Sequence, residues 1–492
     1  MEVKPEDVSA IVKQVLEQLQ GKSNGGGTPI AAPPAVSSAA MSSAAMLAPR
    51  VSEFWAGREG LFDTVDQCVK AAQVAFERLS DLPLSTRKAI IAKMRERFLE
   101  HVEQLSNHAV QETGMGRAID KMKKNRLAAN KTPGLEDIQS RVFTGDDGLT
   151  LIERAPWGVI CSVTPTTNPT ETVMCNGLGM VAAGNTVVFN PHPRAKRVSQ
   201  AAISLLNRAI QEAGGPPNVL TAPLEPTLKT TDEAMNHAGT RLVIVTGGGE
   251  VVKAAFRSGK KAICAGPGNP PAVVDETADL EQAARHIVSS AGLDNTVLCT
   301  AEKEIIVVEK VADQLLEKLK EAGAYHVIGS AAAKLEKLIF PDGSHVNRDL
   351  VGRDIQVILA QVGLEVAPHY RIGIVETPAD HPYVFTEMLF PVLPFVRVKD
   401  VNAAIELAFK AEKGHGHTST MHSKNLDNLH RMAVRMNTAI FVKNGPSYAG
   451  LGEGGEGHTS FSIAHPTGEG LTTARHFTRE VRCTLKGYFR IV

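Results

Sequence analysis

Short apolar runs alternate with segments of helical periodicity after about residue 157, and this alternation constrains the fold more than any other feature. The runs typical of buried strands are 158–163, 186–189, 219–222 and 242–245. The helical segments near them are 170–183, 196–213 and 248–258. A similar alternation runs from Ala272 to about Val398, and a third piece from Val401 to Pro446. Such alternation predicts an α/β fold with parallel sheets covered by helices on both faces.

The chain before this region has a different pattern. Residues 64–79, 85–105 and 119–130 carry apolar side chains at helical spacing, which predicts three helices. Two alternating runs then flank an Asp-Gly pair, Asp147-Gly148, over residues 142–152. This is the signal of a β-hairpin.

The first 50 residues are not typical of a packed domain. Residues 1–20 place six apolar side chains, from Val8 to Leu19, on one face of a helix. Residues 21–50 follow as a linker, since 21 of these 30 are Gly, Ala, Ser or Pro. An apolar helix on a flexible tether indicates docking to a partner; the alternative is that it folds back onto its own chain or a neighbouring subunit.

Charge and cysteine content exclude several classes of protein. Lys plus Arg and Asp plus Glu each total 53, so the net charge is zero and favours neither a nucleic-acid nor a membrane partner. No stretch approaches the roughly 18 apolar residues of a membrane span. The six cysteines are too sparse for a disulfide framework, which indicates a cytoplasmic protein.

A glycine-rich turn follows one of the predicted strands. Thr246, Gly247, Gly248 and Gly249 come directly after the run 242–245 and open a predicted helix. Glycines let a phosphate approach the backbone, and a helix N-terminus offers free N–H groups to it. The spacing matches neither dinucleotide nor phosphate-loop consensus, so a plain tight turn is the alternative.

Two cysteines are candidates for a nucleophile. Cys299 lies in a polar stretch at the end of an element, where a nearby helix N-terminus could lower its pKa. Cys264 lies in a Gly- and Pro-rich loop, whereas the other four (Cys68, Cys161, Cys175 and Cys483) lie in apolar patterns expected in the core. The pair His415 and His417 lacks supporting ligands, so no metal site is expected.

Eight ordered motifs together resemble the aldehyde dehydrogenase superfamily, over about residues 51–492. They are 112–116, 155–159, 164–169, 183–186, 245–248, 268–271, Glu387 with Pro391-Val392, and 441–446. Within the superfamily the chain is similar to the CoA-acylating branch, whose members in bacterial microcompartments act on propionaldehyde or acetaldehyde. Residues 1–20 resemble the encapsulation peptides by which such enzymes enter the shell, which implies a shell protein as partner.

The resemblance implies roles for individual residues. Cys299 matches the nucleophile, and Asn168 matches the amide that forms the oxyanion hole with the cysteine N–H. The residues that match the NAD-binding positions are Thr164, Pro165, Asn190, His192, Thr246, Gly247, Gly248 and Glu387. Glu387 corresponds to the carboxylate that holds the nicotinamide ribose. Where hydrolytic members have a lysine toward the adenosine ribose, this chain has Asn190-Pro191-His192.

A second departure bears on the reaction. Hydrolytic members place a glutamate before their Gly-Gly-Lys segment to activate water, whereas residues 264–268 read Cys-Ala-Gly-Pro-Gly. Without that base, coenzyme A is the expected acceptor, because a thiol needs less activation than water. The expected reaction is oxidation of a short-chain aldehyde, with propionaldehyde favoured, to acyl-CoA with NAD+. The alternatives are a hydrolytic enzyme that makes the free acid and a non-catalytic scaffold.

The resemblance also implies a domain organisation. Residues 51–265 form the NAD-binding domain, with an oligomerisation hairpin near 141–154. Residues 266–446 form the catalytic domain with Cys299, and 447–492 return to the cofactor and oligomerisation region. The hairpin and the last strand match family elements that pair between subunits, so we expect a homodimer or homotetramer inside a bacterial microcompartment.

Overall fold

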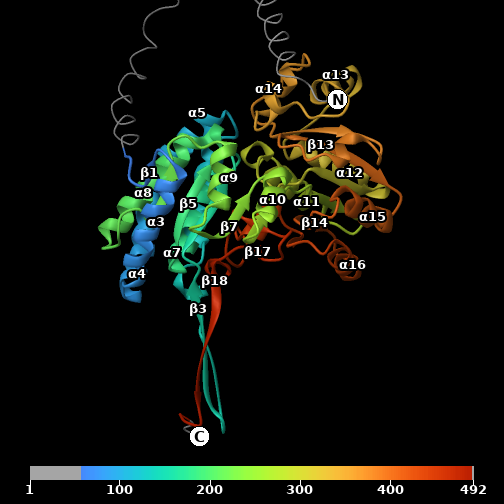
Figure 1. Cartoon of the computed structure of the whole chain (residues 1–492). Coiled ribbons are helices and arrows are strands. Elements are labelled where there is room, and N and C mark those ends of the chain that lie inside the picture. The colour runs from blue at the N-terminus through green and yellow to red at the C-terminus, as the bar shows by residue number, and fades with distance from the viewer. Residues whose placement is uncertain (1–56, 490–492) are drawn as a thin grey trace, which may run out of the picture. The chain divides into compact units, whose positions relative to one another are not determined.

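The computed structural model describes residues 57–489 (Figure 1). The predicted helix over 1–20 and the predicted linker over 21–50 therefore lie outside the described residues. Two parallel sheets carry most of the described strands, with two small antiparallel sheets beside them. The predicted α/β class is confirmed.

The first sheet has six parallel strands in the order β1-β6-β5-β4-β7-β8. They are β1 (Leu61–Phe62), β4 (Val159–Thr164), β5 (Thr186–Pro191), β6 (Leu220–Pro223), β7 (Thr240–Thr246) and β8 (Lys261–Ala265). The four predicted strands correspond to β4 to β7. The chain places β5 and β6 on one side of β4, then β7 and β8 on the other. Open α/β sheets bind ligands at the carboxyl ends of strands where the order reverses in this way.

Helices cover both faces of this sheet, because its strands place apolar side chains on both faces. One face carries α7 (Pro169–Ala182) and α8 (Lys196–Glu212), with α4 (Leu84–Glu100), α5 (Val102–Thr113) and α6 (Ala118–Lys131) packed outside them. The other face carries α3 (Val65–Ser80), α9 (Leu228–Asn236) and α10 (Gly249–Arg257). The single helix predicted over 85–105 is wrong, since the chain leaves helical geometry at His101 and starts a second helix.

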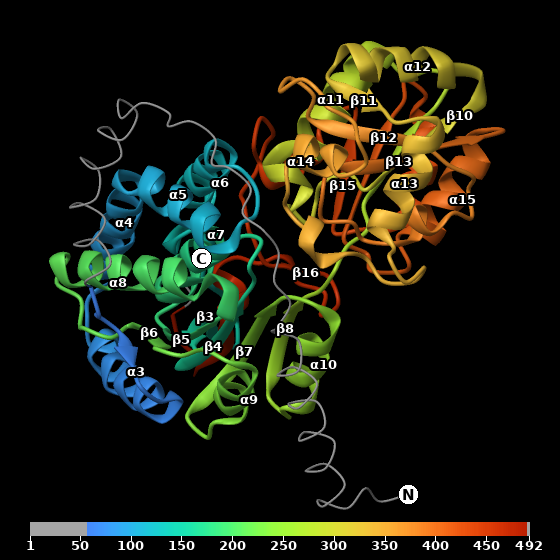
Figure 2. The same cartoon turned by 90° about the horizontal axis from the view of Figure 1, so that it is seen from above.

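The second sheet has seven parallel strands in the order β11-β12-β13-β10-β9-β14-β15 (Figure 2). They are β9 (Pro271–Val274), β10 (Glu304–Val308), β11 (Ala324–His326), β12 (Ile372–Glu376), β13 (Val392–Val398), β14 (Thr418–His422) and β15 (Ile440–Lys443). One face is covered by α11 (Leu280–Ala291) and α12 (Glu309–Glu321), and the other by α15 (Val401–Ala411) and α16 (Leu426–Met436). A satellite core beside β12 holds α13 (Gly329–Ile339) and α14 (Ile355–Ala360).

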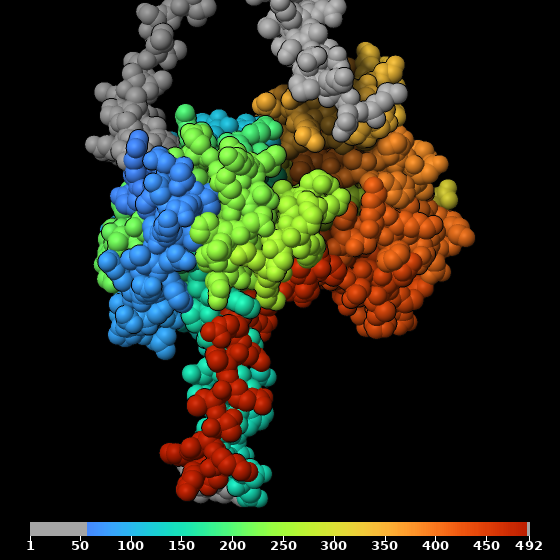
Figure 3. Space-filling view, viewed as in Figure 1, coloured from blue at the N-terminus to red at the C-terminus, as the bar shows by residue number. Residues whose placement is uncertain are grey.

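A three-stranded antiparallel sheet runs away from the helices (Figures 1 and 3). It consists of β2 (Arg141–Gly145), β3 (Gly148–Pro156) and β18 (Thr478–Lys486). The predicted hairpin is therefore confirmed, and the late strand β18 pairs with β3 along its whole length. Almost every side chain of β18 is exposed, Cys483 included. The expectation that Cys483 lies in the core is wrong, because no helix among residues 57–489 covers this strand.

The chain after β15 returns to the first sheet. Here β16 (Ile463–Ala464) pairs with β17 (Gly470–Leu471). Phe461 and Ile463 belong to the core that α7 and α8 share with the sheet. The hydroxyl of Thr467 accepts a hydrogen bond from the N–H of Cys264 in β8 at 3.0 Å. Among the described residues, no helix is long and apolar enough to cross a membrane.

Candidate active site

A cavity of about 680 Å³ opens at the carboxyl ends of β4, β5, β7 and β8. Its walls also include the turn that carries Cys299, the loop before β13 and the returning segment near Phe461. All ten predicted site residues line this one cavity: Cys299, Asn168, Thr164, Pro165, Asn190, His192, Thr246, Gly247, Gly248 and Glu387. Residues separated by more than 200 positions in the sequence thus meet at the point where the strand order reverses.

Cys299 follows a tight turn of unusual geometry. Asp294, Asn295 and Thr296 all have positive φ angles, of 50°, 55° and 64°. Non-glycine residues rarely adopt this left-handed conformation, and clusters of them occur where surrounding contacts enforce it. Those contacts are present: Asn295 Nδ2 donates to the Gly352 carbonyl at 2.9 Å, and the Thr296 hydroxyl donates to the Ala291 carbonyl at 2.6 Å.

The Cys299 thiol is partly buried and is affected by charged groups of both signs. Burial, and secondly the Glu387 carboxylate, raise its pKa to about 11, although Lys303 and Lys124 act in the opposite direction. The expectation of a lowered pKa is therefore wrong for the free protein, because desolvation outweighs any local positive potential. The thiol of the free protein is protonated at neutral pH.

Lys303, which is buried, and Glu387, which is half-buried, lie beside the nucleophile. Lys303 Nζ donates to the carbonyls of Thr296 and Leu298 at 2.8 and 3.3 Å, so it braces the turn before Cys299. Glu387 accepts a hydrogen bond of 3.4 Å from the Gly268 N–H. Burial raises the Glu387 pKa, and Lys303 partly offsets this rise.

Asn168 is the N-cap of α7 and is almost fully buried. Its Oδ1 accepts a hydrogen bond of 2.6 Å from Lys124 Nζ, and its Nδ2 donates to the Thr167 hydroxyl at 3.2 Å. An ammonium group can only donate, so the oxygen of the amide must face Lys124. The NH₂ group is left on the other side, and Asn168 lines the same cavity as Cys299.

The glycine turn has the properties of a diphosphate site. A methyl group added to Gly247, Gly248 or Gly249 would meet nothing within 4 Å, so the turn faces open space. Gly248 is the N-cap of α10 and provides no side chain to satisfy the first N–H groups of that helix. The buried Thr164 hydroxyl at the end of β4 likewise has no partner among the described residues. These donors fit the pyrophosphate of a dinucleotide.

Two predicted cofactor-binding residues, Asn190 and His192, differ in their exposure and in their hydrogen-bond partners. Asn190 lines the cavity, but its amide is engaged with α9: it donates to Thr231 at 2.7 Å and accepts from Thr230 at 2.8 Å. It therefore shapes the wall more than it offers a free polar group. His192 is exposed at the cavity edge, where its Nδ1 accepts a hydrogen bond from the Arg194 N–H at 3.2 Å.

The wall beside the glycine turn, where the Gly247 N–H donates to the Ala265 carbonyl at 3.1 Å, lacks a carboxylate. Ala265, Gly266 and Pro267 line the cavity where hydrolytic relatives carry glutamate, and within residues 57–489 Glu387 is the only acidic side chain in the lining. Cys264 is buried at the end of β8, and burial, with a smaller effect of Glu469, raises its pKa to about 11. It does not line the cavity, so the geometry favours Cys299 of the two candidates.

Sequence reasoning missed four side chains at or beneath this site. His417 and Arg348 line the cavity, whereas Lys303 and Lys124 lie behind Cys299 and Asn168. Burial, and to a smaller extent Lys303, lower the His417 pKa to about 3, so the imidazole is neutral. Lys303 stands between Glu302 and Glu304, and Lys124 lies in a lysine-rich helix, so neither carried a sequence signal of burial.

Comparisons with known proteins agree with the resemblance to aldehyde dehydrogenases. The model of the aldehyde dehydrogenase family matches residues 53–471. The acetylating acetaldehyde dehydrogenase EutE of Salmonella typhimurium is 48% identical over 439 residues, covering 88% of this chain and 94% of that protein.

Solved structures are similar over nearly the same range. The propionaldehyde dehydrogenase of Rhodopseudomonas palustris, with bound CoA and an acylated cysteine, has a TM-score of 0.86 and 45% identity, covering 87% of this chain and 98% of that one. A propionaldehyde dehydrogenase from the fucose utilisation microcompartment of Clostridium phytofermentans has a TM-score of 0.87 and 42% identity, covering 88% and 100%.

Proposed function

Because the chain belongs to the aldehyde dehydrogenase family, and to its CoA-acylating branch, we propose that this site oxidises a short-chain aldehyde to its acyl-CoA through a thioester on Cys299. The observation that carries the proposal is that Cys299 and Asn168 line one cavity whose wall at 265–267 has no carboxylate. That wall argues against the hydrolytic alternative, since no side chain of the segment can deprotonate water.

The chain's own residues account for the nucleophilic steps. The Cys299 thiol releases its proton to solvent, and the thiolate attacks the aldehyde carbonyl. The carbon–sulfur bond forms as the carbonyl π electron pair moves onto the oxygen. The oxyanion accepts hydrogen bonds from Asn168 Nδ2 and the Cys299 N–H. One such donor accelerates acyl transfer by about 10²–10³-fold. In the second half-reaction the CoA thiolate attacks the thioester, and the Cys299 sulfur leaves.

The dinucleotide would be held by Gly247, Gly248 and the N-terminus of α10, with the Thr164 hydroxyl and Glu387 as further polar partners. When bound, NAD+ supplies the acceptor for the hydride that leaves the substrate carbon. A single cavity of about 680 Å³ is of the size that holds one such ligand. We therefore expect the dinucleotide to leave before CoA enters, which predicts ping-pong kinetics.

We propose both propionaldehyde and acetaldehyde as substrates. A second cavity, of only about 10 Å³, lies between Leu298, Leu127 and Tyr448 and shares Phe461 with the large one. Such a space holds about one water molecule, and Cys299 does not line it, so it sets no limit on the length of the acyl chain. Propionaldehyde and acetaldehyde differ by one methylene, which changes selectivity by only about 1–3 kcal/mol, so both are expected substrates.

The partner and location are inferred from one solved relative and from the sequence of residues 1–20. One relative comes from a bacterial microcompartment, and the sequence of residues 1–20 has apolar residues at the spacing that predicts a docking helix. We expect this helix to bind a shell protein. We also expect the three-stranded sheet to pair with that of a second copy, because Val142, Phe143 and Val481 are 41–56% exposed on it.

The test is NADH formation by the purified protein with NAD+ and propionaldehyde, with and without CoA. Turnover only with CoA, and its loss in Cys299→Ala but not in Cys264→Ala, supports the proposal. Sustained turnover without CoA would establish the hydrolytic reaction instead.

A further inference from the structure

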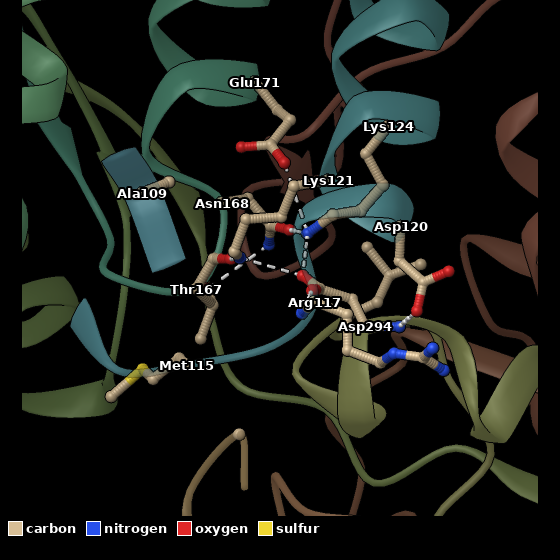
Figure 4. A network of polar contacts seen from close by, with 12 residues as sticks. Ala109, Met115, Arg117, Asp120, Lys121, Lys124, Thr167, Asn168, Glu171 and Asp294 are labelled. Atoms are coloured by element: carbon tan, nitrogen blue, oxygen red, sulfur yellow. Dashed lines mark hydrogen bonds and ion pairs between the residues drawn. The ribbon is translucent and has the colours of Figure 1, made fainter. Parts of the chain in front are cut away.

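A cluster of four fully buried charged side chains lies around Asn168 (Figure 4). Lys121 and Lys124 come from α6, Glu171 from the first turn of α7, and Asp294 from the turn before Cys299. The nucleophilic mechanism above uses none of them. A buried ion pair adds little to stability compared with apolar side chains of the same volume, so a cluster of this kind calls for another explanation.

Lys124 is the centre of the cluster. Its Nζ lies 2.6 Å from Asn168 Oδ1, 2.6 Å from Asp294 Oδ2 and 3.3 Å from Glu171 Oε1. Burial alone would lower the Lys124 pKa, but Asp294 and Glu171 outweigh burial and raise it. The side chain is therefore an ammonium group whose three nearest partners are all acceptors.

Asp294 connects the cluster to the nucleophile. Its Oδ1 accepts a hydrogen bond from the Arg117 N–H at 2.7 Å, and its Oδ2 also contacts Lys121 Nζ at 2.9 Å. It is the first of the three consecutive positive-φ residues that lead to Cys299. The lysines keep it ionised, since they lower its pKa although burial acts to raise it.

We propose that Lys124 is a positioning residue that joins the two halves of the oxyanion hole. Its contact with Oδ1 turns the NH₂ of Asn168 toward the cavity, and its contact with Asp294 ties that amide to the turn that carries the Cys299 N–H. The inference rests on the proposed function of Asn168 and Cys299 and extends it to a residue outside the cavity.

Lys121 provides a matched control, because it lies in the same helix, is equally buried and also binds Asp294. Its Nζ reaches the Thr167 carbonyl at 3.3 Å and does not contact the Asn168 amide. Lys121→Met and Lys124→Met thus each remove one lysine side chain from the same cluster, but only the second removes the contact with Oδ1. If Lys124→Met fails to fold, the charge-balanced K124M/E171Q is compared with E171Q alone.

Two reactions of Cys299 separate positioning from general damage. Acylation by p-nitrophenyl propionate, without dinucleotide, forms the thioester and releases p-nitrophenolate through an oxyanion. Alkylation by iodoacetamide displaces iodide and forms no oxyanion, so it reports only on the thiolate and its accessibility. The measured quantity is the ratio of the acylation rate to the alkylation rate, with circular dichroism to verify folding.

We expect the ratio to fall by about 10²-fold in Lys124→Met, approaching the loss in Asn168→Ala, and by less than about threefold in Lys121→Met. Adding Lys124→Met to Asn168→Ala should cause no further fall, because the residue acts through the amide. Equal ratios in the two lysine variants, or an undiminished effect in the Asn168→Ala background, would overturn the inference. Failure of the proposed function would appear separately, as CoA-independent turnover in the wild-type protein.

Discussion

Replacing Gly116 by alanine tests the buried cluster through Asp294, the member that Gly116 approaches. Gly116 has a φ of +74°, and a Cβ at this position would lie 1.9 Å from Asp294 Oδ1. The methyl group and the carboxylate cannot occupy the same space, so Asp294 must leave its contacts with Lys121 and Lys124. The glycine at position 116 is thus explained by the need to admit this carboxylate close to the backbone.

The magnitude follows from two contributions. An alanine in the left-handed conformation costs about 1–2 kcal/mol. Separating one partner from a buried ion pair costs about 3–5 kcal/mol more. We therefore expect Gly116→Ala to lower the free energy of unfolding by about 4–7 kcal/mol and to slow thioester formation on Cys299, because Asp294 holds the turn before that residue.

Gly114 gives a matched control two residues away. It also has a positive φ, of +67°, but the nearest atom to its added Cβ is Arg353 Nη1 at 3.6 Å. Gly114→Ala should therefore cost only the conformational part, about 1–2 kcal/mol, with activity close to wild type. Guanidinium unfolding of both variants and their CoA-dependent NADH formation provide the measurements. Equal losses of stability in the two variants would refute the reasoning, since the steric contact with Asp294 is the only difference that predicts more.

Three further outcomes are expected. The rate of Cys299 alkylation by iodoacetamide should rise about tenfold per pH unit from pH 7 to 10, because the thiolate is the reactive form. It should level off only near the thiol pKa of about 11. A plateau near pH 8 would contradict the raised pKa of the thiol. Glu387→Gln should lower the Cys299 pKa and speed alkylation at pH 8, because the Glu387 carboxylate is the second largest cause, after burial, of the raised pKa. Slower alkylation in this variant, measured by stopped flow, would show that Glu387 does not raise the Cys299 pKa. Phe143→Asp should reduce the mass of the oligomer in light scattering while leaving the circular dichroism spectrum unchanged, because Phe143 is 56% exposed on the three-stranded sheet; an unchanged mass would remove that sheet as the interface.

The parallel strands could be predicted because their signal is local. Strands β4 to β7 are apolar on both faces, and a run of apolar residues bounded by turns indicates a buried strand at each position. The break at His101 could not be predicted, since α4 and α5 continue the same spacing of apolar residues across it. Cys483 was misassigned because an alternating strand does not reveal whether anything covers its apolar face.

The site could be predicted only as far as the resemblance reached. Cys299 and Asn168 stood out through their motifs, but the raised thiol pKa depends on Glu387, which is 88 positions away, and on burial by several segments. Lys124 carried no such signal, because one lysine in a predicted helix is usually solvent-exposed. What distinguishes it is contact with residues 44 and 170 positions later, and contacts of that kind arise from the fold.

The long pairing between β3 and β18 has a consequence for synthesis on the ribosome. β3 occupies residues 148–156, whereas its partner spans 478–486, so β3 presents an unpaired edge until almost the whole chain has emerged. Phe461 and Ile463, which complete the cavity wall, also arrive late. Nascent chains that pause before residue 460 would carry both sheets but no finished active site, and their free strand edges would favour association between neighbouring nascent chains.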